Sequence, residues 1–98
     1  MFIKVSFQHI ESSDSLREFT EEKSKKIKKF FKGKINLDWH LSQEHERKIA
    51  HCHLTGKNID FFAEDSTKDF QQSIDSVVTK LERQIRKQKE KVKDNLHA

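Results

Sequence analysis

The fold is decided by the stretch INLDWHLSQEHERKIAHCHLTGKNIDFFA, residues 35–63. Its first eight residues alternate between apolar and polar, which is the two-residue period of a half-buried strand. A polar turn at 44–47 interrupts the pattern, and Thr55-Gly56-Lys57-Asn58 supplies the turn chemistry of a hairpin. The stretch therefore predicts three strands in succession, at residues 35–42, 49–55 and 59–63.

One face of these strands is apolar and is expected to form the core. It carries Ile35, Leu37, Trp39, Leu41, Ala50, Cys52, Leu54, Ile59 and Phe61. Cys52 is the single cysteine of the chain, so an internal disulfide is excluded. Because no base is placed to activate its thiol, we interpret Cys52 as a packing residue.

The opposite face of the strands carries His40, His51 and His53. The last two lie two residues apart and could both reach one metal ion. Zinc normally takes three or four protein ligands, and Cys52 points to the other face. We therefore interpret the histidines as surface residues, with metal binding as the alternative.

Two phenylalanines, Phe2 and Phe62, are expected on this outer face as well. Exposed rings could stack on nucleic-acid bases. They could also cover a sheet edge or contact a protein partner, which is the interpretation that we favour.

The segment before this stretch predicts one strand and one helix. Residues 2–7 alternate in the manner of a strand. The run Ser12-Ser13-Asp14 offers an N-cap, and apolar residues then recur at spacings of three and four. An amphipathic helix is therefore expected to follow and to end near Gly33.

The segment after the strands predicts a long helix. Ser66 and Asp69 are spaced like a capping box, and an apolar stripe runs from Phe70 to Ile85. A helix from about Thr67 to Asp94 would be longer than the strands, so its last turns should overhang the sheet. The order β-α-β-β-β-α predicts an α+β domain in which both helices cover one face of a four-stranded sheet.

The charge of the 98-residue chain is unevenly distributed. The formal net charge is +4, but residues 23–34 carry seven lysines and no acid, and residues 80–93 have a net charge of +5. The remaining residues therefore have a net charge of −8. A concentration of basic residues in two predicted helices favours a polyanion as the partner.

This basic character has two interpretations. Lysines near helix C-termini can simply complement the helix dipole or be solvated. Phosphate contact is the alternative, and the number of basic residues in the two windows favours it. On helical geometry, Lys25, Lys28, Lys29 and Lys32 fall opposite the apolar stripe of the first helix. Lys26 falls on its flank, and Lys23 within the apolar arc.

Several classes of function are excluded or disfavoured. With two glycines in the whole chain, neither a dinucleotide-binding fingerprint nor a P-loop can exist. No constellation of catalytic residues can be assigned, so we expect a binding protein without a cofactor rather than an enzyme. The apolar helix faces are needed for the core, which disfavours membrane binding. We expect a single cytoplasmic domain over residues 1–98.

Short segments along nearly the whole chain resemble a known bacterial family. They are His9-Ile10-Glu11, Leu16-Arg17-Glu18-Phe19 with Lys23 and Lys26, Ala63-Glu64, Ile74-Asp75 and, above all, the run from Lys80 to Lys91. Together they are similar to the short hibernation-promoting factors and ribosome-associated inhibitor A proteins, also called sigma-54 modulation proteins. Two departures are Gly56-Lys57, where relatives often have paired glycines, and an end of the chain close to the end of the last helix.

The resemblance implies a ribosome-binding domain, similar in fold to double-stranded-RNA-binding domains. Such a domain would bind ribosomal RNA of the small subunit in the cleft of the A and P sites, compete with mRNA and tRNA, and silence ribosomes in stationary phase or stress. The chain looks like the short form without a dimerisation domain, which would be monomeric when free and could act with a separate small ribosome-dimerising factor.

The resemblance also implies individual contacts. It places candidate ribosomal RNA contacts at Lys23, Lys26, Lys80, Arg83, Lys87, Lys89 and Lys91. From the two basic helices we add Arg86 to these contacts, and Lys25, Lys28 and Lys29 as additional phosphate contacts. The alternative is a general double-stranded RNA-binding or nucleic-acid chaperone module, which the basic helices alone would support equally well.

Overall fold

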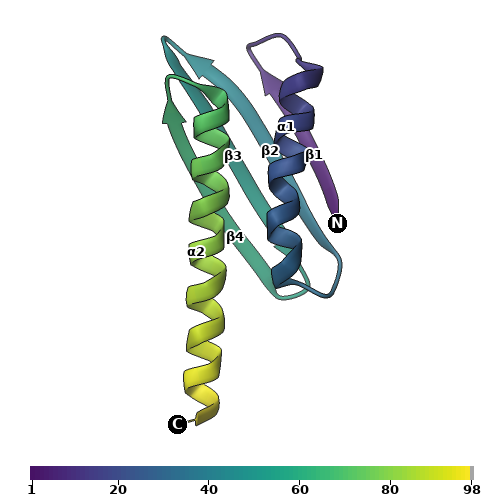
Figure 1. Cartoon of the computed structure of the whole chain (residues 1–98), viewed down its shortest axis with the longest axis vertical. Coiled ribbons are helices and arrows are strands. Elements are labelled where there is room, and N and C mark those ends of the chain that lie inside the picture. Colours follow the sequence, from purple (N-terminus) through teal and green to yellow (C-terminus); the bar gives the residue numbers. More distant parts are fainter. Residues whose placement is uncertain (98) are drawn as a thin grey trace.

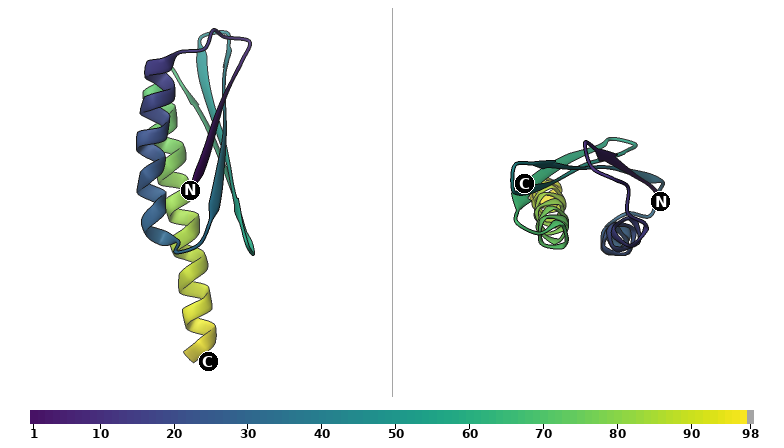
Figure 2. Two further views of the ribbon diagram at one scale, coloured as in Figure 1. Left: turned by 90° about the vertical axis from the view of Figure 1, so that its right-hand side faces the viewer. Right: turned by 90° about the horizontal axis from the view of Figure 1, so that it is seen from above.

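The computed structural model describes the backbone of residues 1–97 and the side chains of residues 1–89. Its elements are β1 (Phe2–Gln8), α1 (Asp14–Ser24), a 3₁₀ helix η1 (Lys25–Phe30), β2 (Ile35–Glu44), β3 (Arg47–Gly56), β4 (Ile59–Thr67) and α2 (Phe70–His97). The strands form one sheet in chain order, and both helices cover the same face of it (Figures 1 and 2). The predicted α+β architecture is confirmed.

The register of the sheet aligns one buried residue from each strand. Strand β1 runs parallel to β2, whereas β2–β3 and β3–β4 are antiparallel. Val5 lies opposite Trp39, Trp39 opposite Cys52, and Cys52 opposite Ala63. All four are buried beneath the helices, so the alternation in sequence selects the face that packs.

A buried chain of hydrogen bonds fastens α1 to the centre of the sheet. The Trp39 indole Nε1 donates to Ser24 Oγ at 2.9 Å, and Ser24 Oγ donates to the Thr20 carbonyl at 2.7 Å. Trp39, Ser24 and Thr20 are fully buried. The largest core residue therefore has a partner for its single polar group.

The first helix differs from the continuous α-helix expected to reach Gly33. The α-helical part ends at Ser24, and residues 25–30 form the 3₁₀ helix η1. The sequence of η1, KKIKKF, repeats every three residues, and a 3₁₀ helix has three residues per turn. Buried Ile27 and half-buried Phe30 consequently fall in one row, which an α-helix would separate.

The predicted capping box at the start of the second helix is wrong. Ser66 belongs to β4, whose pairing with β3 continues to Thr67 opposite Lys48. The helix instead starts after Asp69, whose Oδ1 accepts the Gln71 N–H at 3.3 Å and whose carbonyl accepts the Ser73 N–H at 3.0 Å. With Ser66 in the strand, other side chains satisfy the N–H groups that a capping box would have paired: Asp65 Oδ1 accepts the Ser66 N–H at 2.8 Å, and Thr67 Oγ1 accepts the Asp69 N–H at 3.1 Å.

The end of α2 confirms the predicted overhang. Figure 1 shows the C-terminal turns of the helix continuing past the edge of the sheet where the chain turns from β3 to β4. These turns lie on the side of the molecule where η1 also ends.

The turn between β3 and β4 does not need a second glycine at position 57, because Lys57 is not the residue with positive φ. Asn58 adopts the left-handed conformation, with φ of 59°, which asparagine tolerates better than most residues. Space favours glycine at position 56, because a Cβ there would lie only 3.1 Å from the Lys34 carbonyl oxygen. The hairpin therefore lies close against the loop that leads into β2.

Candidate nucleic-acid interface

The two basic windows of the sequence meet where η1 lies beside α2. Lys29 Nζ of η1 lies 3.7 Å from the Glu82 carboxylate of α2, and Arg86 approaches the same carboxylate at 3.8 Å. The Arg86 guanidinium also lies 5.6 Å from the centre of the Phe30 ring. Basic residues of η1 and α2, which are distant in sequence, are thus brought together in one helical layer, on the face of the sheet that both helices cover (Figure 2).

Phe30 organises the cations at this junction. Lys29, Arg86 and Lys89 all lie within 5.3–5.6 Å of its ring centre, and Lys89 donates a hydrogen bond to its carbonyl oxygen. Cation–π contacts of this kind hold positive charges next to one another at little cost. The flank of α2 that faces η1 is therefore already engaged within the protein.

The 3₁₀ geometry changes the predicted arrangement of the η1 lysines. Residues three apart eclipse one another, so Lys25 and Lys28 form one row and Lys26 and Lys29 form the next. The α-helical projection instead grouped Lys25, Lys28 and Lys29 together and left Lys26 on a flank. All four lysines are exposed.

Three further predicted contacts have partners within the protein. Lys23 pairs with Asp75 of α2 at 3.2 Å and lies against the Phe19 ring. Lys25 pairs with Glu22 at 3.1 Å, one turn earlier. Lys80 approaches Asp65 at 3.7 Å and donates to the Glu64 carbonyl at 3.0 Å.

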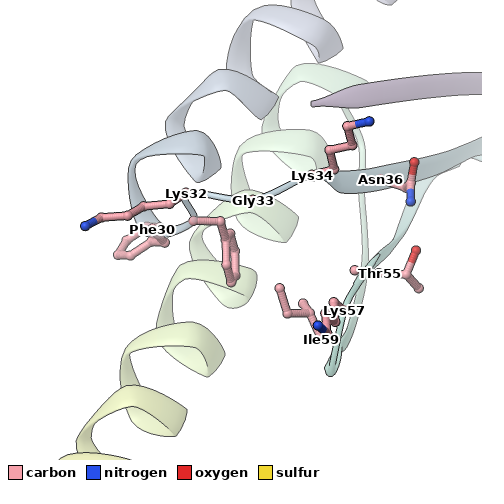
Figure 3. Close-up of a pocket in the computed structure, with 10 residues that line it drawn as sticks. Phe30, Lys32, Gly33, Lys34, Asn36, Thr55, Lys57 and Ile59 are labelled. Atoms are coloured by element: carbon pink, nitrogen blue, oxygen red, sulfur yellow. The ribbon is translucent and has the colours of Figure 1, made fainter.

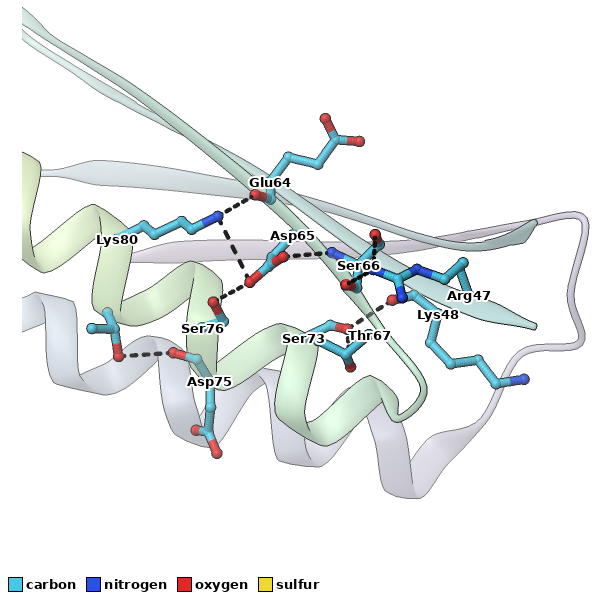
Figure 4. Close-up of polar contacts among 11 residues, drawn as sticks. Arg47, Lys48, Glu64, Asp65, Ser66, Thr67, Ser73, Asp75, Ser76 and Lys80 are labelled. Carbon is cyan, nitrogen blue, oxygen red and sulfur yellow. Dashed lines mark hydrogen bonds and ion pairs between the residues drawn. The ribbon is translucent and has the colours of Figure 1, made fainter. Parts of the chain in front are cut away.

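Lys80 belongs to a polar cluster that closes the free edge of β4 (Figure 4). Gln84 Nε2, one turn along α2, donates to the Phe62 carbonyl at 2.7 Å, so two side chains of the helix cover two carbonyls of this edge strand. Ser76 donates to Asp65, which lowers the pKa of that carboxyl, and the Ser66 N–H and Lys80 act in the same direction.

Four of the predicted contacts are exposed and uncommitted. Among the side chains that the structure describes, no ion pair or hydrogen bond engages Lys26, Lys28, Arg83 or Lys87. Arg83 and Lys87 are four residues apart and share one side of α2. The predicted contact at Lys91 lies outside the described side chains.

A pocket that the sequence analysis did not identify opens beside this layer. It has a volume of about 700 Å³ and lies between the loop that follows η1 and the β3–β4 hairpin (Figure 3). Its lining is Phe30, Phe31, Lys32, Gly33, Lys34, Asn36, Thr55, Gly56, Lys57 and Ile59. The sequence offered no direct signal, because the two loops are more than twenty residues apart.

The outer face of the sheet carries the three histidines and Phe62 as predicted. Phe62 is 48% exposed, and its ring meets His51 edge-on with centres 4.4 Å apart. Burial, followed by repulsion from His40, lowers the pKa of His51. His53 Nε2 lies 2.6 Å from Asp60 Oδ1. Among the described residues, no group of three or more His, Cys, Asp or Glu side chains is arranged to hold a metal ion.

The remaining predictions about single residues concern Cys52 and Phe2. Cys52 is fully buried, and burial raises the pKa of its thiol. Phe2 is 65% exposed at the edge strand β1. Within the described part of the chain, no helix combines the length and the apolar composition needed to cross a membrane.

The fold and this surface define a small α+β domain with a basic helical face. The family model described as Sigma 54 modulation protein / S30EA ribosomal protein matches residues 3–93. The ribosome hibernation promotion factor of Lactococcus lactis is 34% identical over 88 residues, which cover 84% of this chain and 46% of that protein. The chain thus spans about half the length of this curated relative.

Solved structures show the same fold. The N-terminal domain of Protein Y from Thermus thermophilus matches with a TM-score of 0.83 at 23% identity, over 89% of this chain and 98% of that one. A ribosomal subunit interface protein from Coxiella burnetii matches with a TM-score of 0.79 at 25% identity, over 91% and 98% of the two chains. The chain belongs to the Sigma 54 modulation protein / S30EA ribosomal protein family.

Proposed function

We propose that this protein is a ribosome hibernation factor, a cytoplasmic protein that acts by binding and not by catalysis. Residues 1–98 would form its ribosome-binding domain. Family membership and the similarity to the Lactococcus ribosome hibernation promotion factor support the association with ribosomes. The observation that carries the proposal for RNA is the set of exposed, uncommitted cations in one helical layer, Lys26, Lys28, Arg83 and Lys87.

The proposed contact surface is this helical layer. Phosphates of small-subunit ribosomal RNA would approach the four uncommitted cations first. Arg86, Lys29 and Lys89 would reinforce the local positive potential from their places around Phe30, and Lys23, Lys25 and Lys80 would complete the set, together with Lys91. Phosphate contacts fix position without reading sequence, so specificity would come from the shape of the RNA cleft.

The proposed mechanism is steric occupancy. Because its core is closed and both helices are fastened to the sheet, the domain can act as a rigid body in the cleft of the A and P sites. It would exclude mRNA and tRNA there in stationary phase or stress, and release would follow displacement by factors that restart translation. A separate small dimerising factor could then act on ribosomes held in this state.

A general double-stranded RNA-binding module is the second candidate, because exposed lysines alone do not distinguish RNA shapes. We would measure co-sedimentation with isolated small subunits and binding to a generic RNA duplex at the same salt concentration. The proposal predicts a strong preference for the subunit, reduced by added mRNA and tRNA. Equal binding to the duplex, without competition, would favour the general module.

A further inference from the structure

The pocket beside η1 combines an aromatic wall with neighbouring positive charge, two features that proteins use to bind single-stranded nucleic acid. Phe31 and Ile59 give it apolar walls, and the ring of Phe31 is only partly buried. Phe30 is surrounded by three cations, whereas Phe31 has one cation, Lys89, at 5.5 Å. Phe31 is therefore the ring more available to a planar ligand.

The rim of the pocket is positive. Lys32 and Lys34 flank Gly33 in the loop, and their side chains extend outward from the cavity, whereas Lys57 lies beside Ile59 on the hairpin (Figure 3). These three lysines are exposed, and no acidic residue is among those lining the pocket. An anionic group at the mouth would thus meet positive charge from two separate loops.

Asn36 of β2 and Thr55 of β3 lie opposite each other in the sheet register and border the pocket. Their side chains lie on the outer face of the sheet, as those of His40 and His53 do, and do not point into the cavity (Figure 3). The volume of about 700 Å³ falls within the range of roughly 300–1,000 Å³ typical of small-molecule sites.

From this combination we propose that the pocket binds one unstacked nucleotide of RNA, with the base against Phe31 and the phosphate at the lysine rim. This inference rests on the proposed function, because it takes the RNA to be that of the ribosome. It adds a site for a single base to a surface otherwise made of phosphate contacts. Base–aromatic stacking tolerates any base, so no sequence preference is required.

The two glycines of the chain provide a direct test. Gly33 and Gly56 both line the pocket, and glycine amides are readily recognised in a nitrogen–proton NMR spectrum. We would titrate the protein with AMP at millimolar concentrations, as expected for one nucleotide, and with adenosine and inorganic phosphate separately. We expect AMP to shift both amides in a saturable manner and to bind more tightly than either part alone.

Variants separate the base from the phosphate. Phe31→Leu keeps an apolar side chain but removes the ring, and should weaken AMP binding about tenfold. Lys57→Gln should weaken it about threefold. Lys68→Gln, an exposed lysine between β4 and α2 at the other end of the sheet, is the matched control and should change nothing. The remaining amide spectrum reports whether each variant is folded.

Three outcomes would overturn the proposal: unchanged glycine amides with AMP, equal shifts with phosphate alone, or equal effects of Lys57→Gln and Lys68→Gln. A short oligoadenylate distinguishes the source of the nucleotide. Tighter binding of the oligomer than of AMP supports RNA, whereas tighter binding of AMP indicates a free nucleotide and contradicts the RNA source. These titrations contain no ribosome, so a negative result would contradict the nucleotide pocket and leave the proposed ribosome binding intact. Failure to co-sediment with small subunits would contradict the proposed ribosome binding and would leave AMP binding in the pocket untouched.

Discussion

Trp39 shows how one residue connects the sheet with the helix that carries part of the basic surface. Its alternation with Leu37 and Leu41 places the indole in the core, where its N–H needs a partner. Ser24 supplies that partner from the last position of α1, immediately before the lysines of η1. The placement of these lysines therefore depends on a buried hydrogen bond.

We expect Ser24→Ala to destabilise the protein. The substitution leaves the buried indole N–H unpaired, which costs about 1–3 kcal/mol in the free energy of unfolding. Chemical denaturation followed by fluorescence of the single tryptophan would measure this. Ser15→Ala, at an exposed position on α1, is the control. Equal stability of Ser24→Ala and the unmodified protein would show that the bond contributes nothing.

The outer sheet face should make stability depend on pH through His51. Its pKa is lowered below 6.5 in the folded protein, so the unfolded chain binds more protons as the pH falls through this value. The free energy of unfolding should consequently decrease. The surrounding charges are His40 and Asp38 on β2, His53 on β3 and Glu64 on β4.

His51→Gln tests this dependence. The variant should lose less stability than the unmodified protein when the pH is lowered from above 7 to mildly acidic values. Denaturation curves at several pH values would measure the difference. If both proteins lose stability in parallel, the lowered pKa of His51 is not responsible.

At the scale of elements, periodicity identified the strands and helices but could not identify contacts between them. The strands follow from alternation, which is local. The capping pattern at Ser66 misled because β4 continues through that residue to pair with β3. The repeat of η1 was visible in the sequence, yet a 3₁₀ helix of six residues is uncommon enough that an α-helix was expected.

The same limit applies to the candidate site. The sequence identified the basic residues, but their partners come from other elements: Asp75 for Lys23, Asp65 for Lys80, Glu82 for Lys29. Which cations remain uncommitted is therefore a property of the packing. The pocket between the loop after η1 and the hairpin could not be predicted for the same reason.

Glu82 gives a prediction at this scale. Its carboxylate lies between Lys29 and Arg86 and offsets part of their charge. We expect Glu82→Gln to tighten binding to small ribosomal subunits and to steepen its salt dependence, because the local positive potential increases. Glu46→Gln, in the exposed turn between β2 and β3, changes the net charge equally and should have little effect. Weaker binding of Glu82→Gln would contradict this expectation.

At the scale of the whole molecule, the net charge of +4 is misleading because it averages two regions of opposite sign. The basic windows lie at the end of α1, in η1, in the loop that follows it and in α2, whereas Asp38 and Glu64 lie beside the histidines on the outer sheet face. Such a distribution orients the molecule toward a polyanion. We therefore expect the location of the positive charges to affect RNA binding more than their number does.

The most direct test compares two double variants of equal charge in co-sedimentation with small ribosomal subunits over a range of salt concentrations. Arg83→Gln/Lys87→Gln should weaken binding about tenfold and reduce the slope of log affinity against log salt by about 2. Lys4→Gln/Lys68→Gln, which removes the same charge from the outer sheet face and the β4–α2 turn, should leave both unchanged. Equal losses in the two variants, or none in the first, would contradict the placement of the RNA surface on the helical layer.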